Sequence, residues 1–258
     1  MSRAVAINVG ANTNQPGFRG PIYSDGRFRY VPIPEDEPTR EPVPTYADLD
    51  LDDVPGYDPA VIGDRPVHLD PTFAAYPCCE TDTYGDPHPV KAGPIAELSP
   101  GDWLLFYATL STVDQTQSPP WIAPEWGAYL IGEFRVERVV APDPAALDDD
   151  FADALDPADV LDPADRRRFR TNAHLRRERF DARVLVAGDP EASRLYERAI
   201  PLSSRDAGSD PNRLVTELSA DSGKGPWWRR PLRFDESSTA TLREILDDRR
   251  LGACFDDR

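Results

Sequence analysis

The chain has 258 residues and carries 46 acidic against 29 basic side chains, a formal net charge of −17. At ordinary ionic strength this charge opposes binding to nucleic acid, because such affinity depends on neutralising phosphates. No apolar run approaches the roughly 18 residues of a membrane span, and the first residues lack a leader pattern, so we expect a cytoplasmic protein with no membrane partner.

The first part of the chain predicts short strands followed by a segment rich in Pro and Asp. Residues 4–10 alternate as a strand does, and residues 22–34 predict a hairpin with Asp25 and Gly26 in its turn. Between residues 35 and 64 the Pro and Asp content favours an extended surface arm with at most a short helix. This arm is a candidate docking segment for a protein partner.

Two strong strands are predicted between residues 95 and 140. A turn at residues 99–102 precedes an uncharged run that starts at Trp103, and a second run extends from Ala128 to Val140. The alternation of the second run is imperfect around Gly132, which predicts a bulge or a close backbone approach at that residue.

The next segment, residues 142–200, is predicted to be a helical segment followed by a strand–helix unit. Its helices are expected to start at four Asp-Pro steps, because Asp caps unpaired amides and Pro suits the first helical position. These steps are Asp143-Pro144, Asp156-Pro157, Asp162-Pro163 and Asp189-Pro190. A last helix near residues 237–250 has Ser237 or Ser238 as its candidate cap. No internal domain boundary is visible, so residues 1–258 are expected to form one α+β domain.

The predicted strand pair resembles the PUA-like fold group, including its ASCH and EVE branches. The residues that carry this resemblance are Gly101, Asp102, Leu105, Phe106, Tyr107, Ile131, Gly132, Phe134 and Val136. The resemblance implies a small bent β-barrel, or a mixed sheet with flanking helices, and a pocket of the size of a nucleobase.

A second resemblance spans most of the chain. The stretches "INVGANTNQPGFRGPIYSDGRFRYVPIPE", "HLDPTF", "TYGD", "GDWLLFYATL", "NAHLRR" and "LVAGDPEASRLYERAIPLS" occur in an order similar to that of the third family of nucleotide modification associated domains. The resemblance implies an association with base modification of nucleic acids, without a settled reaction. The insertion "AAYPCCETD" between the second and third stretches departs from the family pattern.

Candidate catalytic residues come from the few histidines and their neighbouring carboxylates. His68 stands two residues before Asp70, and Asp86 stands two residues before His88. An imidazole beside a carboxylate suits acid–base chemistry, so the candidates are His68, Asp70, Asp86 and His174. Their spacing matches no zinc signature, and the sequence therefore predicts neither a metal nor a cofactor. The alternative is a turn at His68 and a solvated loop at His88.

Candidate ligand-binding residues combine aromatic rings with groups that can read a base or meet a phosphate. Trp103 and Tyr107 are candidates for stacking on a base, and Asn172 with His174 can donate and accept hydrogen bonds at a base edge. The remaining candidates are Arg19, Tyr84, Lys224, Trp227 and Arg229. The alternative for each aromatic residue is a place in the hydrophobic core, and for His174 a helix terminus.

The amino-acid composition also bears on whether the negative charge excludes binding to nucleic acid. Only Lys91 and Lys224 are lysines, so 27 of the 29 basic residues are arginine. This pattern is similar to that of cytosolic proteins from salt-accumulating extreme halophiles. At molar salt the Debye length is about 3 Å, so stacking and hydrogen bonds decide recognition and a nucleic-acid partner is permitted.

Three hypotheses follow from the sequence. The first is a protein that binds nucleic acid or a nucleotide and holds a base in an aromatic pocket. The second is an enzyme of base modification that uses the His and Asp candidates, and it requires His68, Asp70 and Asp86 to converge. The third is an assembly protein that docks a partner through residues 35–64. We favour the first, because aromatic residues are better represented than catalytic clusters.

Overall fold

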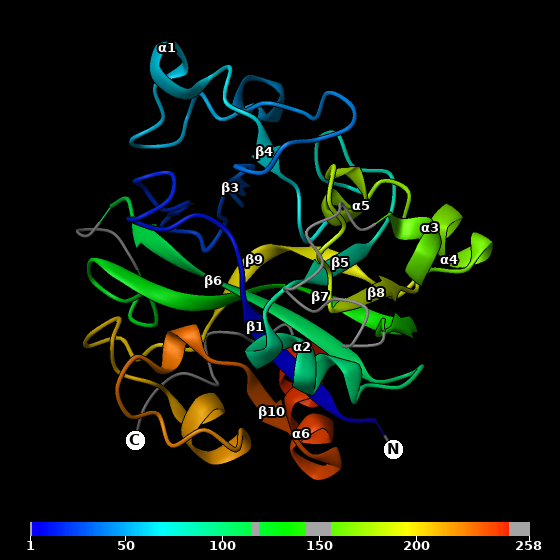
Figure 1. Cartoon of the computed structure of the whole chain (residues 1–258). Coiled ribbons are helices and arrows are strands. Elements are labelled where there is room, and N and C mark those ends of the chain that lie inside the picture. Colours follow the sequence, from blue (N-terminus) through cyan, green and yellow to red (C-terminus); the bar gives the residue numbers. More distant parts are fainter. Residues whose placement is uncertain (1, 115–118, 143–155, 248–258) are drawn as a thin grey trace.

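The computed structural model describes residues 2–114, 119–142 and 156–247. A mixed sheet crosses the molecule, and different parts of the chain cover its two faces (Figure 1). The main path of the sheet runs through β10 (Leu232–Phe234), β1 (Ala4–Asn8), β6 (Trp103–Thr112), β7 (Trp126–Val140), β8 (Val184–Gly188) and β5 (Thr83–Asp86). Two further strands branch from it, β2 (Pro21–Ile22) beside β6 and β9 (Arg194–Pro201) beside β7.

The predicted strand pair forms the centre of this sheet as β6 and β7. Alternate residues of β6 enter two separate core clusters, with Leu104 and Phe106 on one face and Trp103 and Tyr107 on the other. The β6–β7 register shifts opposite Gly132, where an added Cβ would lie 2.6 Å from the Phe73 ring. The bulge and close approach predicted there are confirmed.

The sheet stays open. β10 and β5 are its two ends, and no strand pairing within the described ranges joins them. The α+β class with a mixed sheet and few helices is therefore confirmed, whereas the bent barrel implied by the PUA-like resemblance is not. The parallel β1–β6 pair places β1 and β10 beyond β6 and extends the sheet away from β5.

One face of the sheet is covered by segments from the first hundred residues (Figure 1). They include the small sheet of β3 (Ile33–Pro34) and β4 (Val67–His68), and the helix α2 (Pro89–Ala96). Ile95 of α2 and Phe73 of the loop after β4 are fully buried in the core on this face. The burial of these apolar side chains holds β4 and β5 close together.

The segment of residues 35–64 packs against that core and is not a detached arm. It contains a short 3-10 helix (Tyr46–Leu49) and the one-turn helix α1 (Pro59–Ile62). Tyr46 is fully buried, and its hydroxyl donates a hydrogen bond of 2.9 Å to the carbonyl of Pro32. Leu49 and Val54 are also buried. The apolar residues spaced among the Pro and Asp residues therefore anchor the segment.

The other face is covered by the last part of the described chain. Its elements are a π-helical turn (Leu214–Leu218), a 3-10 turn (Trp227–Arg229) and α6 (Glu236–Asp247). The carboxylate of Asp235 accepts a 2.8 Å hydrogen bond from the amide of Ser238, so Asp235 caps α6 instead of Ser237 or Ser238. Leu242 packs from α6 into the core cluster that contains Trp103.

The helical segment is confirmed in part. The helices α3 (Pro157–Val160) and α4 (Pro163–Arg168) begin at Asp-Pro steps, with Asp156 and Asp162 each accepting a 2.8 Å hydrogen bond from the second residue beyond. α5 (Ala173–Arg176) follows them. The Asp143-Pro144 step lies outside the described residues.

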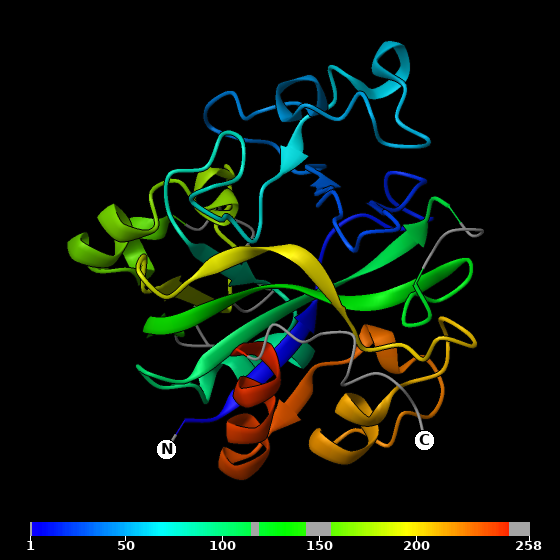
Figure 2. The same ribbon diagram turned by 180° about the vertical axis from the view of Figure 1, so that it is seen from behind.

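The helix expected after Asp189 is a strand, β9, so the expected strand–helix unit is two successive strands, β8 and β9, that each pair with β7. Asp189 caps only a turn, through a 2.9 Å hydrogen bond from the amide of Glu191. β9 then pairs with β7, for instance Ile200 with Leu130, and Figure 2 shows the two strands side by side. Backbone pairing with the central strand overrides the local helical preference of this segment.

Candidate functional site

Three buried side chains from separate parts of the chain meet at one point. His68 ends β4, Asp70 follows it, and His174 belongs to α5. The Nε2 atom of His174 lies 3.3 Å from Oδ2 of Asp70, and Nε2 of His68 lies 3.9 Å from the same oxygen. These side chains are at most 7% exposed. We call this group, together with the neighbours described next, the Asp70 centre.

Each imidazole of the Asp70 centre is held by an outer carboxylate. Nδ1 of His68 lies 2.6 Å from Glu35, and Nδ1 of His174 lies 2.6 Å from Asp181. Arg177 joins the two carboxylates, donating hydrogen bonds of 2.8 Å to Glu35 and 2.6 Å to Asp181. Because carboxylates accept, these contacts assign the proton of each ring to Nδ1 and direct Nε2 towards Asp70.

Asp70 itself is fixed by backbone and side-chain donors. The amide of Gly85 in β5 donates to both of its oxygens at 3.0 and 3.1 Å, and Asn172 donates to Oδ1 at 3.2 Å. Gly85 is required here, because an added Cβ would lie 2.6 Å from Cδ2 of His174. The side-chain oxygen of Asn172 also accepts from the amide of His174 and caps α5. Asn172 therefore positions both the carboxylate of Asp70 and the backbone of His174.

The electrostatics of the centre follow from this arrangement. Burial alone would lower the pKa of His174, but the hydrogen bond with Asp181 and the charges of Asp70 and Asp181 raise it to about 9. Burial would raise the pKa of Glu35, but His68 and Arg177 lower it to about 2. Nε2 of His174 makes no hydrogen bond, although it is buried and faces Asp70. Arg177 thus pairs with Glu35 and Asp181, and a protonated His174 pairs with Asp70.

Asp86 lies beside the centre without joining its innermost group. Its carboxylate accepts hydrogen bonds from the hydroxyl of Tyr84 and from the amide of His88, the latter at 2.7 Å, and lies 3.7 Å from the amine of Lys91. The predicted convergence of His68 and Asp70 is present, but His174 and not Asp86 completes it. His88 is exposed, at the start of α2.

Trp103 and Tyr107 lie in the core on the opposite face of β6 from Phe106. The Trp103 ring packs beneath the guanidinium of Arg243, whose carbon is 3.8 Å from the ring centre. The hydroxyl of Tyr107 donates a 2.7 Å hydrogen bond to the carbonyl of Arg230. Both rings are buried, at 7% and 0% exposure. They occupy the place expected of core residues, and contact with a ligand stays a prediction.

The remaining predicted ligand-binding residues lie around a tryptophan cluster. The guanidinium carbon of Arg19 is 4.7 Å from the ring centre of Trp126, and the rings of Trp126 and Trp228 are 5.4 Å apart. Burial lowers the pKa of Arg19. Trp227 is fully buried, with its Nε1 donating to the carbonyl of Ser209 at 2.8 Å. Lys224 and Arg229 are exposed on the same loop.

Four residues of importance were not predicted as site residues: Glu35, Arg177, Asp181 and Trp126. Glu35 opens the Pro- and Asp-rich segment, and its acidic neighbours give it no distinguishing pattern. Arg177 belongs to the Arg-rich stretch after residue 165, in which nothing separates it from the other arginines. Arg177 and Asp181 are four residues apart, but α5 ends at Arg176, so this spacing is not that of a pair on one helix and gave no local signal.

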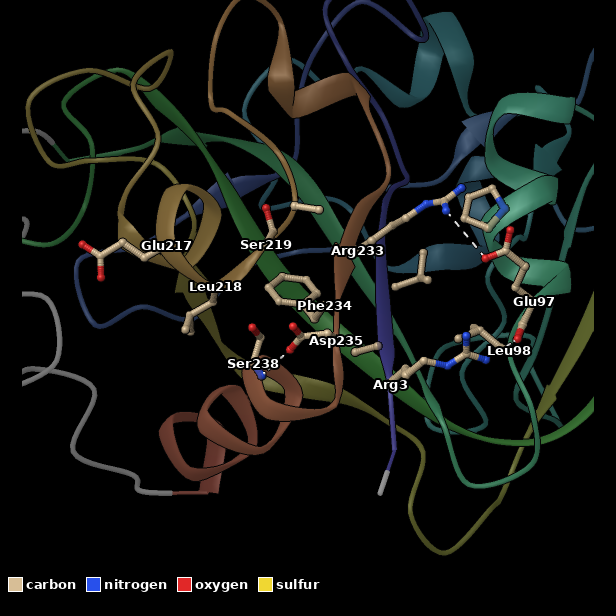
Figure 3. A pocket seen from close by; sticks show the side chains of 14 residues that line it. Arg3, Glu97, Leu98, Glu217, Leu218, Ser219, Arg233, Phe234, Asp235 and Ser238 are labelled. Carbon is tan, nitrogen blue, oxygen red and sulfur yellow. Dashed lines mark hydrogen bonds and ion pairs between the residues drawn. The ribbon is translucent and has the colours of Figure 1, made fainter.

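The pocket drawn in Figure 3 is a different place, between β1, β10, α2 and the turn at residues 214–218. Its volume is about 400 Å³. Figure 3 shows Arg233 of this pocket paired with Glu97, 3.6 Å apart, and Asp235 accepting a hydrogen bond from the amide of Ser238. A second hollow of about 490 Å³ lies beside Tyr23, with its neighbours Arg29 and Asp53 paired. His174, with its unpartnered Nε2, lines neither of these two hollows.

The Asp70 centre also contains the group best suited to holding a metal. One ligand atom each of His68, Asp70 and His174 lies within 4.8 Å of the other two. No other such group of histidine, cysteine and carboxylate side chains occurs in the part of the chain that the structure describes.

A comparison with family models shows which family the chain belongs to. The model of nucleotide modification associated domain 3 matches residues 3–244. The chain belongs to the nucleotide modification associated domain 3 family. The resemblance stated from the sequence is therefore confirmed, and the family name associates the protein with nucleotide modification. No curated protein and no solved structure matches the chain. Within the described residues, every helix is too short or too polar to cross a membrane.

Proposed function

We propose that this member of the nucleotide modification associated domain 3 family is an enzyme that modifies a nucleotide or a base of nucleic acid at the Asp70 centre. The observation that supports it is the meeting of His68 and His174 on one buried carboxylate. Burying several charged groups is costly, and such clusters are concentrated where chemistry requires them. The family name, which associates the domain with nucleotide modification, supports nucleotides or nucleic-acid bases as the substrate class of this proposal.

The roles of the residues follow from their contacts. Nε2 of each histidine faces inward and is the atom of each ring that can exchange a proton with a substrate. Asp70, held by Gly85 and Asn172, supplies a fixed negative charge beside both atoms. Arg177 and its two carboxylates hold the rings in one orientation. Such preorganisation allows a reacting base to meet groups that need no rearrangement.

The test is the nucleoside composition of cells that produce the protein. DNA, RNA and the free nucleotide pool are digested to nucleosides and compared by mass spectrometry. The wild type is expected to add or remove a nucleoside in one pool, and Asp70→Asn is expected to abolish the change. His88→Ala, which alters the exposed histidine, is expected to retain it. An unchanged composition with the wild type, or a change that survives Asp70→Asn, contradicts the proposal.

A second candidate is a protein that binds nucleic acid or a nucleotide without chemistry, stacking a base on aromatic rings. The observation that favours it is the half-buried pair of Trp126 and Trp228 with Arg19 against Trp126. A partly exposed ring beside a guanidinium suits stacking on a base, worth about 1–3 kcal/mol. Trp228→Ala is expected to weaken the binding of single-stranded DNA, measured by fluorescence anisotropy. Unchanged affinity would count against this candidate.

The assembly hypothesis gains no support from the packing of residues 35–64. The segment holds Tyr46 and Leu49 in the core and delivers Glu35 to the Asp70 centre. Its deletion would therefore remove core and site together, so a docking role has to be tested with substitutions of its exposed residues, such as Val61 at 76% exposure.

A further inference from the structure

We propose that the Asp70 centre binds a divalent transition-metal ion through Nε2 of His68, the carboxylate of Asp70 and Nε2 of His174. This inference deepens the proposed function and rests on it for the purpose of the ion, but the binding itself is measured separately. Two imidazoles and one carboxylate are a ligand set that suits zinc, iron, cobalt or manganese better than magnesium or calcium.

The first argument is the direction of the lone pairs. Glu35 and Asp181 each accept the Nδ1 proton of one ring, so in a neutral ring Nε2 carries a lone pair. Both Nε2 atoms face Oδ2 of Asp70, which is also an acceptor. Three atoms that can each offer a lone pair thus face one point, which favours a cation there, either a proton or a metal ion.

The second argument is the spacing of these atoms. The 3.3 Å between His174 Nε2 and Asp70 Oδ2 exceeds the roughly 2.8 Å of a charge-assisted hydrogen bond. It matches the separation of about 3.4 Å between two ligands of a tetrahedral ion with bonds near 2.1 Å. No hydrogen bond forms there. The 3.9 Å from His68 Nε2 to the same oxygen lies outside hydrogen-bond reach but close to this ligand spacing.

The third argument is the support around each ligand. Histidines that bind metals usually donate their other N–H to a carboxylate, which fixes the ring and raises its basicity. His68 has Glu35 in this place and His174 has Asp181. Asp70 is held by the amide of Gly85. Each of the three proposed ligand side chains is thus held by a hydrogen bond from its other side. A simple buried ion pair does not require this arrangement at every member.

The fourth argument is charge. Asp70, Glu35 and Asp181 supply three negative charges and Arg177 supplies one positive charge. When both rings bind an ion as neutral imidazoles, these side chains carry a net charge of −2, which a divalent ion cancels. Three protein ligands also leave positions at the ion for water or a substrate atom, as in catalytic sites. A bound ion would there polarise a substrate oxygen or activate a water molecule.

The experiment is calorimetric titration of the full-length protein, without an affinity tag and after treatment with a chelator, using Zn²⁺ and separately Co²⁺. We expect one ion per chain. His68→Ala and His174→Ala are expected to weaken the binding of Zn²⁺ by more than 100-fold, and His88→Ala to leave it unchanged. Asp181→Asn, which keeps all three ligands, is expected to weaken it about 10- to 100-fold.

A measurement on the wild type alone covers the case in which these variants fail to fold. The visible absorption of bound Co²⁺ is expected to show histidine nitrogen ligands and fewer than six ligands in total. Absence of saturable binding by the wild type, a hydrated six-coordinate Co²⁺ spectrum, or an equal loss with His88→Ala overturns the metal site. Stoichiometric binding with unchanged nucleosides contradicts only the proposed function. Absence of saturable Zn²⁺ binding together with a nucleoside change that Asp70→Asn abolishes contradicts only the metal site.

Discussion

The Asp70 centre and the core cluster around Trp103 and Tyr107 are both buried, yet they differ in how their polar atoms are satisfied. In the Trp103 cluster the hydroxyl of Tyr107 and the indole nitrogen of Trp227 each donate to a backbone carbonyl. In the Asp70 centre, Nε2 of His174 is buried without a hydrogen bond. A buried polar atom without a partner is unusual and requires an explanation, whereas a satisfied aromatic ring is ordinary core. This difference supports the proposed function at the centre and a stabilising role for the cluster.

The largest expected effect is the loss of stability on Trp103→Ala. The ring is 7% exposed and packs beneath Arg243, so its removal leaves a cavity in the core. We expect the free energy of unfolding to fall by about 3–5 kcal/mol, measured by denaturant unfolding. Zn²⁺ affinity of the folded protein should not change. Val90→Ala, at a residue 72% exposed, should stay within about 0.5 kcal/mol of wild type. A small loss of stability together with weakened nucleotide binding would instead show that Trp103 belongs to a binding site.

The next effect is expected from Gly85→Ala, which adds one methyl group at the Asp70 centre. The new Cβ would lie 2.6 Å from His174 and 3.1 Å from Leu185, so the histidine must move. We expect a loss of about 1–3 kcal/mol in unfolding free energy, together with weaker Zn²⁺ binding. Gly93→Ala is the control, because that glycine has no atom near its added Cβ and is exposed in α2. Unchanged Zn²⁺ affinity in Gly85→Ala would show that His174 is not a ligand of the ion.

The smallest effect is expected from Tyr107→Phe. The variant keeps the ring and removes the hydrogen bond to the carbonyl of Arg230. We expect the free energy of unfolding to fall by about 1 kcal/mol, seen as a modest drop in melting temperature. The nucleoside composition produced by the variant should equal that of the wild type. A selective loss of the nucleoside change would show that Tyr107 contacts the substrate.

The fold was predictable where one segment alone determined its structure. The aromatic run after Trp103 and the interruption at Gly132 gave the central strand pair correctly. β9 was predicted as a helix, because its pairing with β7 is a long-range contact that local propensity does not encode. Closure of the sheet into a barrel depends on which strands meet at its two ends, and no local pattern reports that.

The site was predictable as a set of residues but not as a geometry. His68, Asp70 and His174 were all named from their chemistry, yet Asp86 was expected to complete the group. Asn172, beside His174, bonds to Asp70 across 102 residues of sequence. Only the folded sheet brings β4, β5 and α5 together. Glu35 was missed for the same reason, since its contact with Arg177 spans 142 residues.

The most direct test of the central claim is to locate a bound nucleotide by ultraviolet cross-linking. The wild-type protein is irradiated with a mixture of ribo- and deoxynucleotides, and the modified peptides are identified by mass spectrometry. The account predicts cross-links in the segments 67–86 and 172–181, which build the Asp70 centre. Cross-links confined to the peptides of Trp126 and Trp228 would contradict it and place the base on the tryptophan cluster.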